Sequence, residues 1–182
     1  LYQEWLSDAK VIREKYMRDL GSRTYGSIIR RHLKDCQSPI SILGAGHLTL
    51  EILPWLECAS HDVRVYCRRE AQGLELKEKY KKINVYAFDE DKLSGPAGAV
   101  VVSAPVKGDI LARWIQKNSN AVTQMIDLRG DSSTDKPNLG VELSTLTLHD
   151  LFNEMQSAEK EIELKVLQAR RKIGELVRQR SQ

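Results

Sequence analysis

A short apolar run followed by two closely spaced glycines is the feature of this chain with the clearest chemistry. Residues 39–43 predict a buried strand, and a helix is expected from residue 47 onward. A strand that turns tightly into a helix presents backbone N–H groups and the positive end of the helix dipole to a phosphate. We therefore predict a dinucleotide pyrophosphate site at this turn. The residues expected to bind it are Gly44, Ala45, Gly46, His47 and Leu48.

The tip of the next predicted strand indicates which dinucleotide is bound. Residues 63–67 form the second apolar run, and Arg68 and Arg69 follow it directly. A site for NAD usually places Asp or Glu there against the ribose hydroxyls, whereas arginines favour the 2′-phosphate of NADP. The sequence thus predicts NADPH as the cofactor. The G-x-G-x-x-G pattern is incomplete, because Thr49 stands at its third glycine position.

Three further positions are candidates for the same cleft. Ser103, Ala104 and Pro105 end the fourth apolar run, where they either let the nicotinamide half of a cofactor pass close to the backbone or simply end a strand. Asp127 ends the fifth run, and it either holds a turn or faces the cleft. The ring of His47 either contacts the cofactor or is solvated.

Between residues 39 and 145 the apolar runs alternate with helical segments, which is typical of a parallel sheet with helices on both faces. Pro54 is expected to kink or end the first of these helices, because proline removes a backbone hydrogen bond. The expected fold is an α/β, Rossmann-like, doubly wound parallel sheet with N-terminal helices and a long C-terminal helix. We predict strands at 39–43, 63–67, 83–87, 99–103 and 122–128, and helices at 47–57, 70–81 and 107–117.

The N-terminal residues are predicted to form two helices. Residues 1–20 carry an apolar stripe at spacings of three and four that includes Trp5 and Tyr16, and a shorter helix covers residues 24–33. The three parts expected along the chain are connecting helices at 1–36, an NADP-binding domain at 37–146 and a long connecting helix at 147–182.

The last part is predicted to begin with a capping box, Thr147 to Asp150, which starts a helix. Apolar residues then recur at steps of three and four as far as Leu176. Such a helix either folds back along its own domain, or it carries a further domain or pairs with a second subunit. The basic clusters at 30–34 and 170–172 are interpreted as solvated faces, with a role in holding RNA as the alternative.

Composition excludes several classes of protein. The 182-residue chain has a formal net charge of +3, which is too small by itself to argue for nucleic acid. No apolar run approaches the roughly 18 residues that a membrane helix needs, and no secretory signal is visible. Cys36, Cys58 and Cys67 lack C-x-x-C spacing and are expected to be reduced thiols in a cytoplasmic protein. No metal site is expected, and Cys36 and Cys58 lack the nearby base that a catalytic nucleophile needs. Cys67 is expected at the strand tip beside the adenine half of a cofactor, far from hydride transfer.

At several points, in order along the chain, the sequence resembles the cofactor-binding part of glutamyl-tRNA reductase. Residues 42–46 resemble the approach to the family's first Rossmann strand, Arg68 matches its arginine at the second strand tip, and residues 101–104 resemble its I-I-S-A/S-T segment. Residues 9–13 resemble its A-K-x-V-R stretch. The passage from Ile126-Asp127-Leu128 to Leu148-His149-Asp150-Leu151 resembles its approach to the long spinal helix.

The resemblance implies a function. In that family a cysteine of a separate N-terminal domain takes the glutamyl group from its tRNA as a thioester, and NADPH then delivers hydride to give glutamate-1-semialdehyde for tetrapyrrole biosynthesis. The S-T-C-N-R nucleophile segment and the C-terminal dimerisation domain are not among these residues. The chain is therefore expected to bind and orient NADPH and to have no reductase activity alone. Glutamyl-tRNA is expected to bind through the catalytic domain of a homodimeric full-length protein.

The sequence also departs from the family pattern. Cys67 and Arg69 replace its Asn and Thr, and residues 129–131 replace its Pro-Arg-Asp run. One alternative is a siroheme-pathway NAD-dependent dehydrogenase, although such proteins usually begin close to the first strand and residues 1–38 precede it here. The other alternative is a non-catalytic nucleotide-binding or interaction protein, which the missing third glycine would allow.

Overall fold

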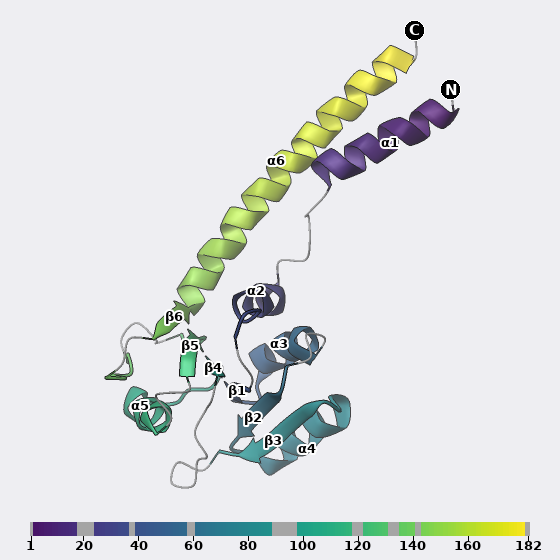
Figure 1. The fold of residues 1–182 in the computed structure, drawn as a ribbon. Helices are drawn as coiled ribbons and strands as arrows, with labels where there is room; N and C mark the ends of the chain where they lie inside the picture. Colours follow the sequence, from purple (N-terminus) through teal and green to yellow (C-terminus); the bar gives the residue numbers. More distant parts are fainter. Residues whose placement is uncertain are drawn as a thin grey trace. The chain divides into compact units, whose positions relative to one another are not determined.

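The computed structural model describes residues 2–17, 24–36, 39–57, 61–88, 98–117, 122–130, 135–140 and 143–180. A six-stranded parallel sheet carries helices on both faces (Figure 1). The strands are β1 (Ile40–Leu43), β2 (Val63–Cys67), β3 (Ile83–Ala87), β4 (Gly98–Val102), β5 (Val122–Asp127) and β6 (Ser144–Thr147). Their order, β3-β2-β1-β4-β5-β6, is that of the Rossmann fold, so the predicted fold class is confirmed.

Burial explains why the central strands could be predicted. All residues of β1 and β4 are buried, because strands in the middle of a parallel sheet are covered on both faces and are therefore continuously apolar. The five predicted strands lie within one residue of their expected bounds. The sixth, β6, was not predicted. It is a short, half-exposed edge strand of sequence Ser-Thr-Leu-Thr, which lacks an apolar run.

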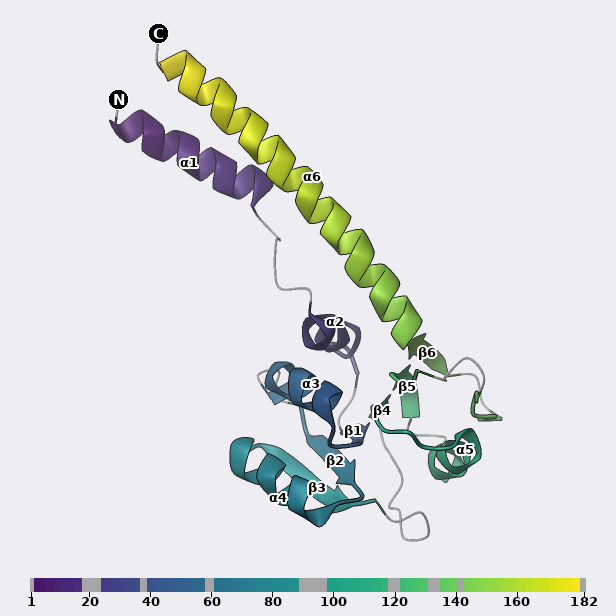
Figure 2. The ribbon, with the colours of Figure 1, turned by 180° about the vertical axis from the view of Figure 1, so that it is seen from behind.

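Four helices surround the sheet within residues 24–151. The first, α2 (Tyr25–His32), packs against α3 (His47–Glu57), which covers one face together with α4 (Glu70–Lys79). The remaining helix, α5 (Gly108–Gln116), lies on the opposite face (Figure 2). Its Trp114 and Ile115 are buried in a core cluster with Val100 and Val102 of β4.

α3 does not end at Pro54 but continues to Glu57, the predicted end of the helix. Proline cannot donate to the carbonyl of the residue four positions earlier, which here is Leu50. The hydroxyl of Tyr80 donates to that carbonyl instead, at 3.4 Å. A side chain from the end of the next helix thus replaces the hydrogen bond that the proline removes.

The two remaining helices are α1 (Tyr2–Tyr16) and α6 (Leu148–Arg180). Residues 24–151 form one compact unit, and the described residues of 1–23 and 152–182 form a second. The predicted end of the first helix at residues 20–22 lies outside the described residues. With 33 residues, α6 is about 50 Å long. The described helices include none with the length and hydrophobicity needed to cross a bilayer.

The predicted capping box at the start of α6 is confirmed. The backbone N–H and the hydroxyl of Thr147 donate to a carboxylate oxygen of Asp150, at 2.8 and 2.6 Å. The backbone N–H of Asp150 donates back to the Thr147 hydroxyl at 3.3 Å. These hydrogen bonds to the ionised carboxylate lower the pKa of Asp150.

Candidate functional site

The turn after β1 has a backbone that requires glycine. Gly44 has a φ of +117°, in a region that side chains with a Cβ avoid. A Cβ built on it would lie 2.8 Å from Ser103 Oγ and 2.9 Å from the Cβ of Ala104. The Gly44 N–H donates to the carbonyl of Tyr66 at 2.9 Å, which ties the turn to the end of β2.

The second glycine of the turn is open to solvent. Apart from its own residue and the two adjacent residues, a Cβ on Gly46 would have no protein atom within 4 Å, and α3 begins at the next residue. The protein itself therefore does not require a glycine at this position. An anion at the N-terminus of α3 would require one, because it has to approach the backbone closely to reach the N–H groups of the first helical turn.

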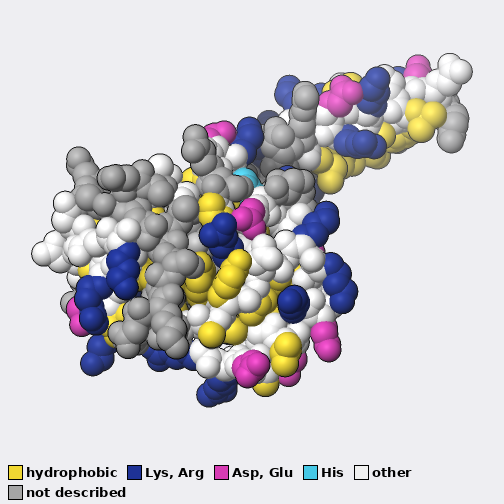
Figure 3. Space-filling model, turned by 60° about the horizontal axis from the view of Figure 1, so that its bottom comes forward, with side chains coloured by type: hydrophobic (Ala, Val, Ile, Leu, Met, Phe, Trp, Pro, Cys, Tyr) yellow, Lys and Arg dark blue, Asp and Glu magenta, His cyan; other side chains and the backbone are white. Residues whose placement is uncertain are grey.

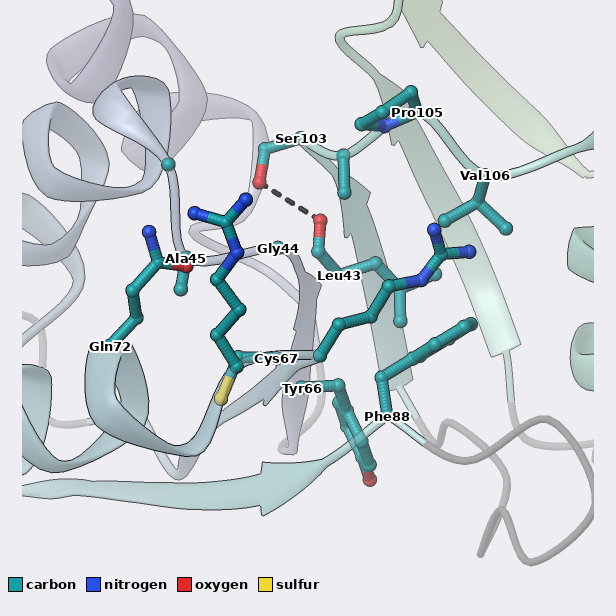
Figure 4. A pocket seen from close by; sticks show the side chains of 14 residues that line it. Leu43, Gly44, Ala45, Tyr66, Cys67, Gln72, Phe88, Ser103, Pro105 and Val106 are labelled. Atoms are coloured by element: carbon teal, nitrogen blue, oxygen red, sulfur yellow. Dashed lines mark hydrogen bonds between the residues drawn. The ribbon is translucent and has the colours of Figure 1, made fainter.

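Thr49, at the third glycine position, is completely buried and holds the turn. Its hydroxyl lies 2.9 Å from the carbonyl of Gly44 and 2.7 Å from Ser103 Oγ, which lies 2.9 Å from the carbonyl of Leu43 (Figure 4). The hydroxyls of Thr49 and Ser103 thus make three short polar contacts, which join the residues at the ends of β1 and β4. The departure from the glycine pattern therefore adds hydrogen bonds between α3 and the sheet.

A cleft of about 220 Å³ opens at this turn, at the carboxyl ends of the central strands (Figure 4). Its position between β1 and β4 is the switch point of the strand order, where open α/β sheets bind their ligands. The lining residues come from four segments of the chain. They are Leu43, Gly44, Ala45, Gly46, Tyr66, Cys67, Arg68, Arg69, Gln72, Phe88, Ser103, Ala104, Pro105 and Val106.

The charge in this cleft is positive. Arg68 and Arg69 are both exposed, and no carboxylate occurs among the lining residues that the structure describes. The Arg68 guanidinium lies over the ring of Phe88, with 5.5 Å between its carbon and the ring centroid, which is within the range of a cation–π contact. Arg69 is the N-cap residue of α4 and makes no side-chain capping hydrogen bond.

The structure brings most of the predicted cofactor-binding residues to this one cleft. Two lie elsewhere. His47 lines a neighbouring depression and pairs with Glu51 one helical turn later, at 3.0 Å, and half-buried Leu48 lines neither space. The predicted residues that line the cleft are Gly44, Ala45, Gly46, Arg68, Arg69, Ser103, Ala104 and Pro105.

Six lining residues were not among the predicted cofactor-binding residues: Leu43, Tyr66, Cys67, Gln72, Phe88 and Val106. Phe88 directly follows β3, and its position at a strand end is a signal that could have identified it. Gln72 lies in the first turn of α4 and lines the cleft from there. From the sequence, Tyr66 cannot be distinguished from an ordinary core residue. Tyr66 is indeed buried, stacked on Tyr86 with 5.4 Å between ring centroids.

Asp127 holds a turn and does not line the cleft. Its carboxylate accepts hydrogen bonds from the Arg129 guanidinium, with 2.9 Å from Nε to Oδ1 and 2.7 Å from Nη2 to Oδ2. Both side chains are buried, at 2% and 3% exposure. Arg129 also donates to the carbonyl of Val106 at 2.6 Å and to the carbonyl of Asp135 at 2.9 Å. The pair thus supports the loop after β4, which forms one wall of the cleft.

The described cysteines have the properties of unreactive thiols. Burial raises the pKa of Cys67, and burial likewise raises the pKa of Cys36. Both are free, and a higher pKa leaves less nucleophilic thiolate at neutral pH. Cys58 lies outside the described residues. Among the residues that the structure describes, no group of three His, Cys, Asp or Glu side chains is placed to hold a metal ion.

No protein-family model matches the sequence, and no curated protein matches it. Solved structures do match. The nucleotide-binding domain of glutamyl-tRNA reductase from Thermoplasma volcanium superposes with a TM-score of 0.57 at 17% identity, over 79% of this chain and 99% of that chain. Glutamyl-tRNA reductase from Methanopyrus kandleri gives 0.56 at 20% identity, over 96% of this chain and 50% of that chain.

A shikimate 5-dehydrogenase-like protein also matches, with a TM-score of 0.53 at 14% identity, over 76% of this chain and 52% of that chain. The chain thus spans about half the length of two of these proteins. At such low identities the comparisons show the fold, which is a Rossmann-like domain of the type found in dehydrogenases.

Proposed function

We propose that this chain is the NADPH-binding domain of a protein similar to glutamyl-tRNA reductase. The observation that carries the proposal is the cleft itself, in which a glycine turn at a helix N-terminus lies beside two exposed arginines. NADPH, when bound, supplies a hydride for reduction of a glutamyl thioester to glutamate-1-semialdehyde. The chain's own residues bind and orient that cofactor, as proteins do in cofactor enzymes generally.

Each half of the cofactor has residues that fit it. Gly46 leaves open the space that a Cβ would fill, so a pyrophosphate can approach the N-terminus of α3. Arg68 and Arg69 offer planar guanidinium donors to a 2′-phosphate at the tip of β2. The small residues Ala104 and Pro105 leave room on the far wall for the nicotinamide half.

Titration of the chain with NADPH and with NADH, followed by cofactor fluorescence, tests this proposal. The expected result is a clear preference for NADPH. A preference for NADH would favour a dehydrogenase of the siroheme-pathway type, and binding of neither nucleotide would favour an interaction protein. Because burial raises the pKa of both described cysteines and so leaves less nucleophilic thiolate, we also expect no semialdehyde formation by the chain alone.

The two glycines of the turn provide a matched pair of variants. Gly44→Ala is expected to destabilise the fold by about 1–3 kcal/mol, because its φ is positive and its Cβ would meet Ser103. Gly46→Ala is expected to leave stability within about 0.5 kcal/mol and yet weaken NADPH binding at least about tenfold, since its Cβ would displace the pyrophosphate. Urea denaturation and NADPH titration measure the two effects. Unchanged NADPH affinity in Gly46→Ala would argue against a pyrophosphate at this turn.

A further inference from the structure

The wall of the cleft that follows β4 is a short loop that leads into α5. Residues 104–106 line the cleft, and α5 begins at Gly108. Within this loop the Val106 N–H donates to the carbonyl of Ala104 at 2.8 Å, a contact between residues only two positions apart. Lys107, the N-cap residue of α5, makes no side-chain capping hydrogen bond. Contacts from another part of the chain are therefore needed to fix this wall.

Asp135, in the loop after β5, caps α5 in place of the N-cap residue. Its Oδ2 accepts a hydrogen bond from the backbone N–H of Gly108 at 2.7 Å. A negative charge at this position also interacts favourably with the positive end of the helix dipole. A Cβ on Gly108 would lie 2.6 Å from Oδ1 of Asp135 and 3.0 Å from its carbonyl oxygen. A larger residue at position 108 would thus push the carboxylate away from the helix.

The same carboxylate oxygen joins this cap to the buried guanidinium of Arg129. Nη1 of Arg129 lies 3.2 Å from Asp135 Oδ2 and donates to the carbonyl of Val106 at 2.6 Å. The wall is thus held at Val106 and at Gly108 by two side chains that also bind each other. The Arg129 side chain is only 2% exposed, whereas that of Asp135 is 44% exposed and does not line the cleft.

We propose that Asp135 is a positioning residue for the nicotinamide half of the cofactor. This inference rests on the proposed function, in which that half lies against Ala104 and Pro105. Asp135 acts through the wall, because it holds the N-terminus of α5 and the loop before it in one arrangement before the cofactor binds. A preformed wall avoids the entropy lost by ordering it on binding, so the affinity is higher. The adenosine half binds at the tip of β2 and does not depend on this wall.

Binding of two ligands to the full chain tests this role. NADPH carries both halves of the cofactor, whereas adenosine 2′,5′-bisphosphate carries the adenosine half with its 2′-phosphate and no nicotinamide. Asp135→Ala is expected to weaken NADPH binding about five- to tenfold and to change the affinity for the bisphosphate by no more than about twofold. Asp135→Asn can still accept the Gly108 N–H but offers Arg129 no charge, so an intermediate NADPH affinity is expected. Fluorescence titration measures the NADPH affinity, and calorimetry measures that of the bisphosphate.

Asp109→Ala is the matched control for the charge change. Asp109 lies in the first turn of the same helix, its side chain is 71% exposed, and it does not line the cleft. On the face of the molecule that Figure 3 shows, Lys and Arg side chains are interspersed with Asp and Glu. Loss of one exposed carboxylate therefore changes the surrounding field only slightly. The NADPH affinity of Asp109→Ala is expected to stay within about twofold of the parent chain.

Gly108→Ala reaches the same contact from the other side, since its Cβ displaces the Asp135 carboxylate. It is expected to weaken NADPH to a similar degree, and its loss is expected not to add to that of Asp135→Ala in the double variant. Urea denaturation shows whether each variant is folded. If Asp135→Ala is not, Asp135→Asn gives the same comparison with a smaller expected loss.

The two ligands together decide the outcome. Equal losses for NADPH and the bisphosphate in folded Asp135→Ala, or no loss for either, would overturn the positioning role. A loss confined to NADPH, absent from Asp109→Ala, supports it. Failure of the unaltered chain to bind either ligand would overturn the proposed function, and with it this inference.

Discussion

Arg129→Ala is expected to destabilise the domain by about 3–5 kcal/mol, because it leaves the carboxylate of Asp127 buried without its partner. The same change removes hydrogen bonds to the carbonyls of Val106 and Asp135. Loss of the buried hydrogen bond to the Val106 carbonyl adds to the cost. Urea denaturation followed by tryptophan fluorescence measures the effect, since Trp114 is buried in the core.

An exposed ion pair on the same domain serves as the control. Arg113 pairs with Asp109 at 3.8 Å, and both side chains are about two-thirds exposed. Arg113→Ala is expected to cost less than about 1 kcal/mol, because solvent screens such pairs. The double variant Asp127→Leu with Arg129→Met removes both buried charges, and it is expected to be more stable than Arg129→Ala alone. A loss below about 1 kcal/mol in Arg129→Ala would show that Asp127 is held by other groups.

Arg68→Ala is expected to weaken NADPH binding by about 10- to 100-fold, which corresponds to the roughly 1.5–3 kcal/mol of hydrogen bonds to a charged group. NADH lacks the 2′-phosphate, so its affinity is expected to change by no more than about twofold. Arg68→Lys keeps the charge but loses the planar pair of donors, and an intermediate affinity is expected. Fluorescence titration with each nucleotide gives all three affinities.

Arg30→Ala is the matched control for this series. Arg30 is an exposed arginine of α2 that does not line the cleft, and its removal changes the net charge by the same amount. Its NADPH affinity is expected to stay within about twofold of the parent chain at physiological salt, where the Debye length is about 8 Å. If Arg30→Ala and Arg68→Ala weakened NADPH equally, the arginine at the β2 tip would act only through net charge. Equal losses for NADPH and NADH in Arg68→Ala would exclude a 2′-phosphate contact.

The sequence by itself determined the parts of the fold that local pattern encodes. Apolar runs located β1, β2, β4 and β5 because the middle strands of a parallel sheet are buried on both faces. The glycine turn and the capping box of α6 could be predicted because each depends on residues a few positions apart. The position of the arginines at the tip of β2 beside this turn could also be predicted, because the carboxyl ends of parallel strands lie at one edge of a sheet.

Only the tertiary structure decided the features that join distant segments. In the sequence, Thr49 is a departure from the glycine pattern. The structure shows that its hydroxyl contacts the hydroxyl of Ser103, which is 54 positions later. Asp127 could have faced the cleft, and the buried guanidinium of Arg129 decided that it holds the turn. Tyr80 permits Pro54 within α3 by donating to Leu50 from another helix. Hydrogen bonds of this kind depend on where folding brings side chains in space, which residue types and spacing along one segment do not specify.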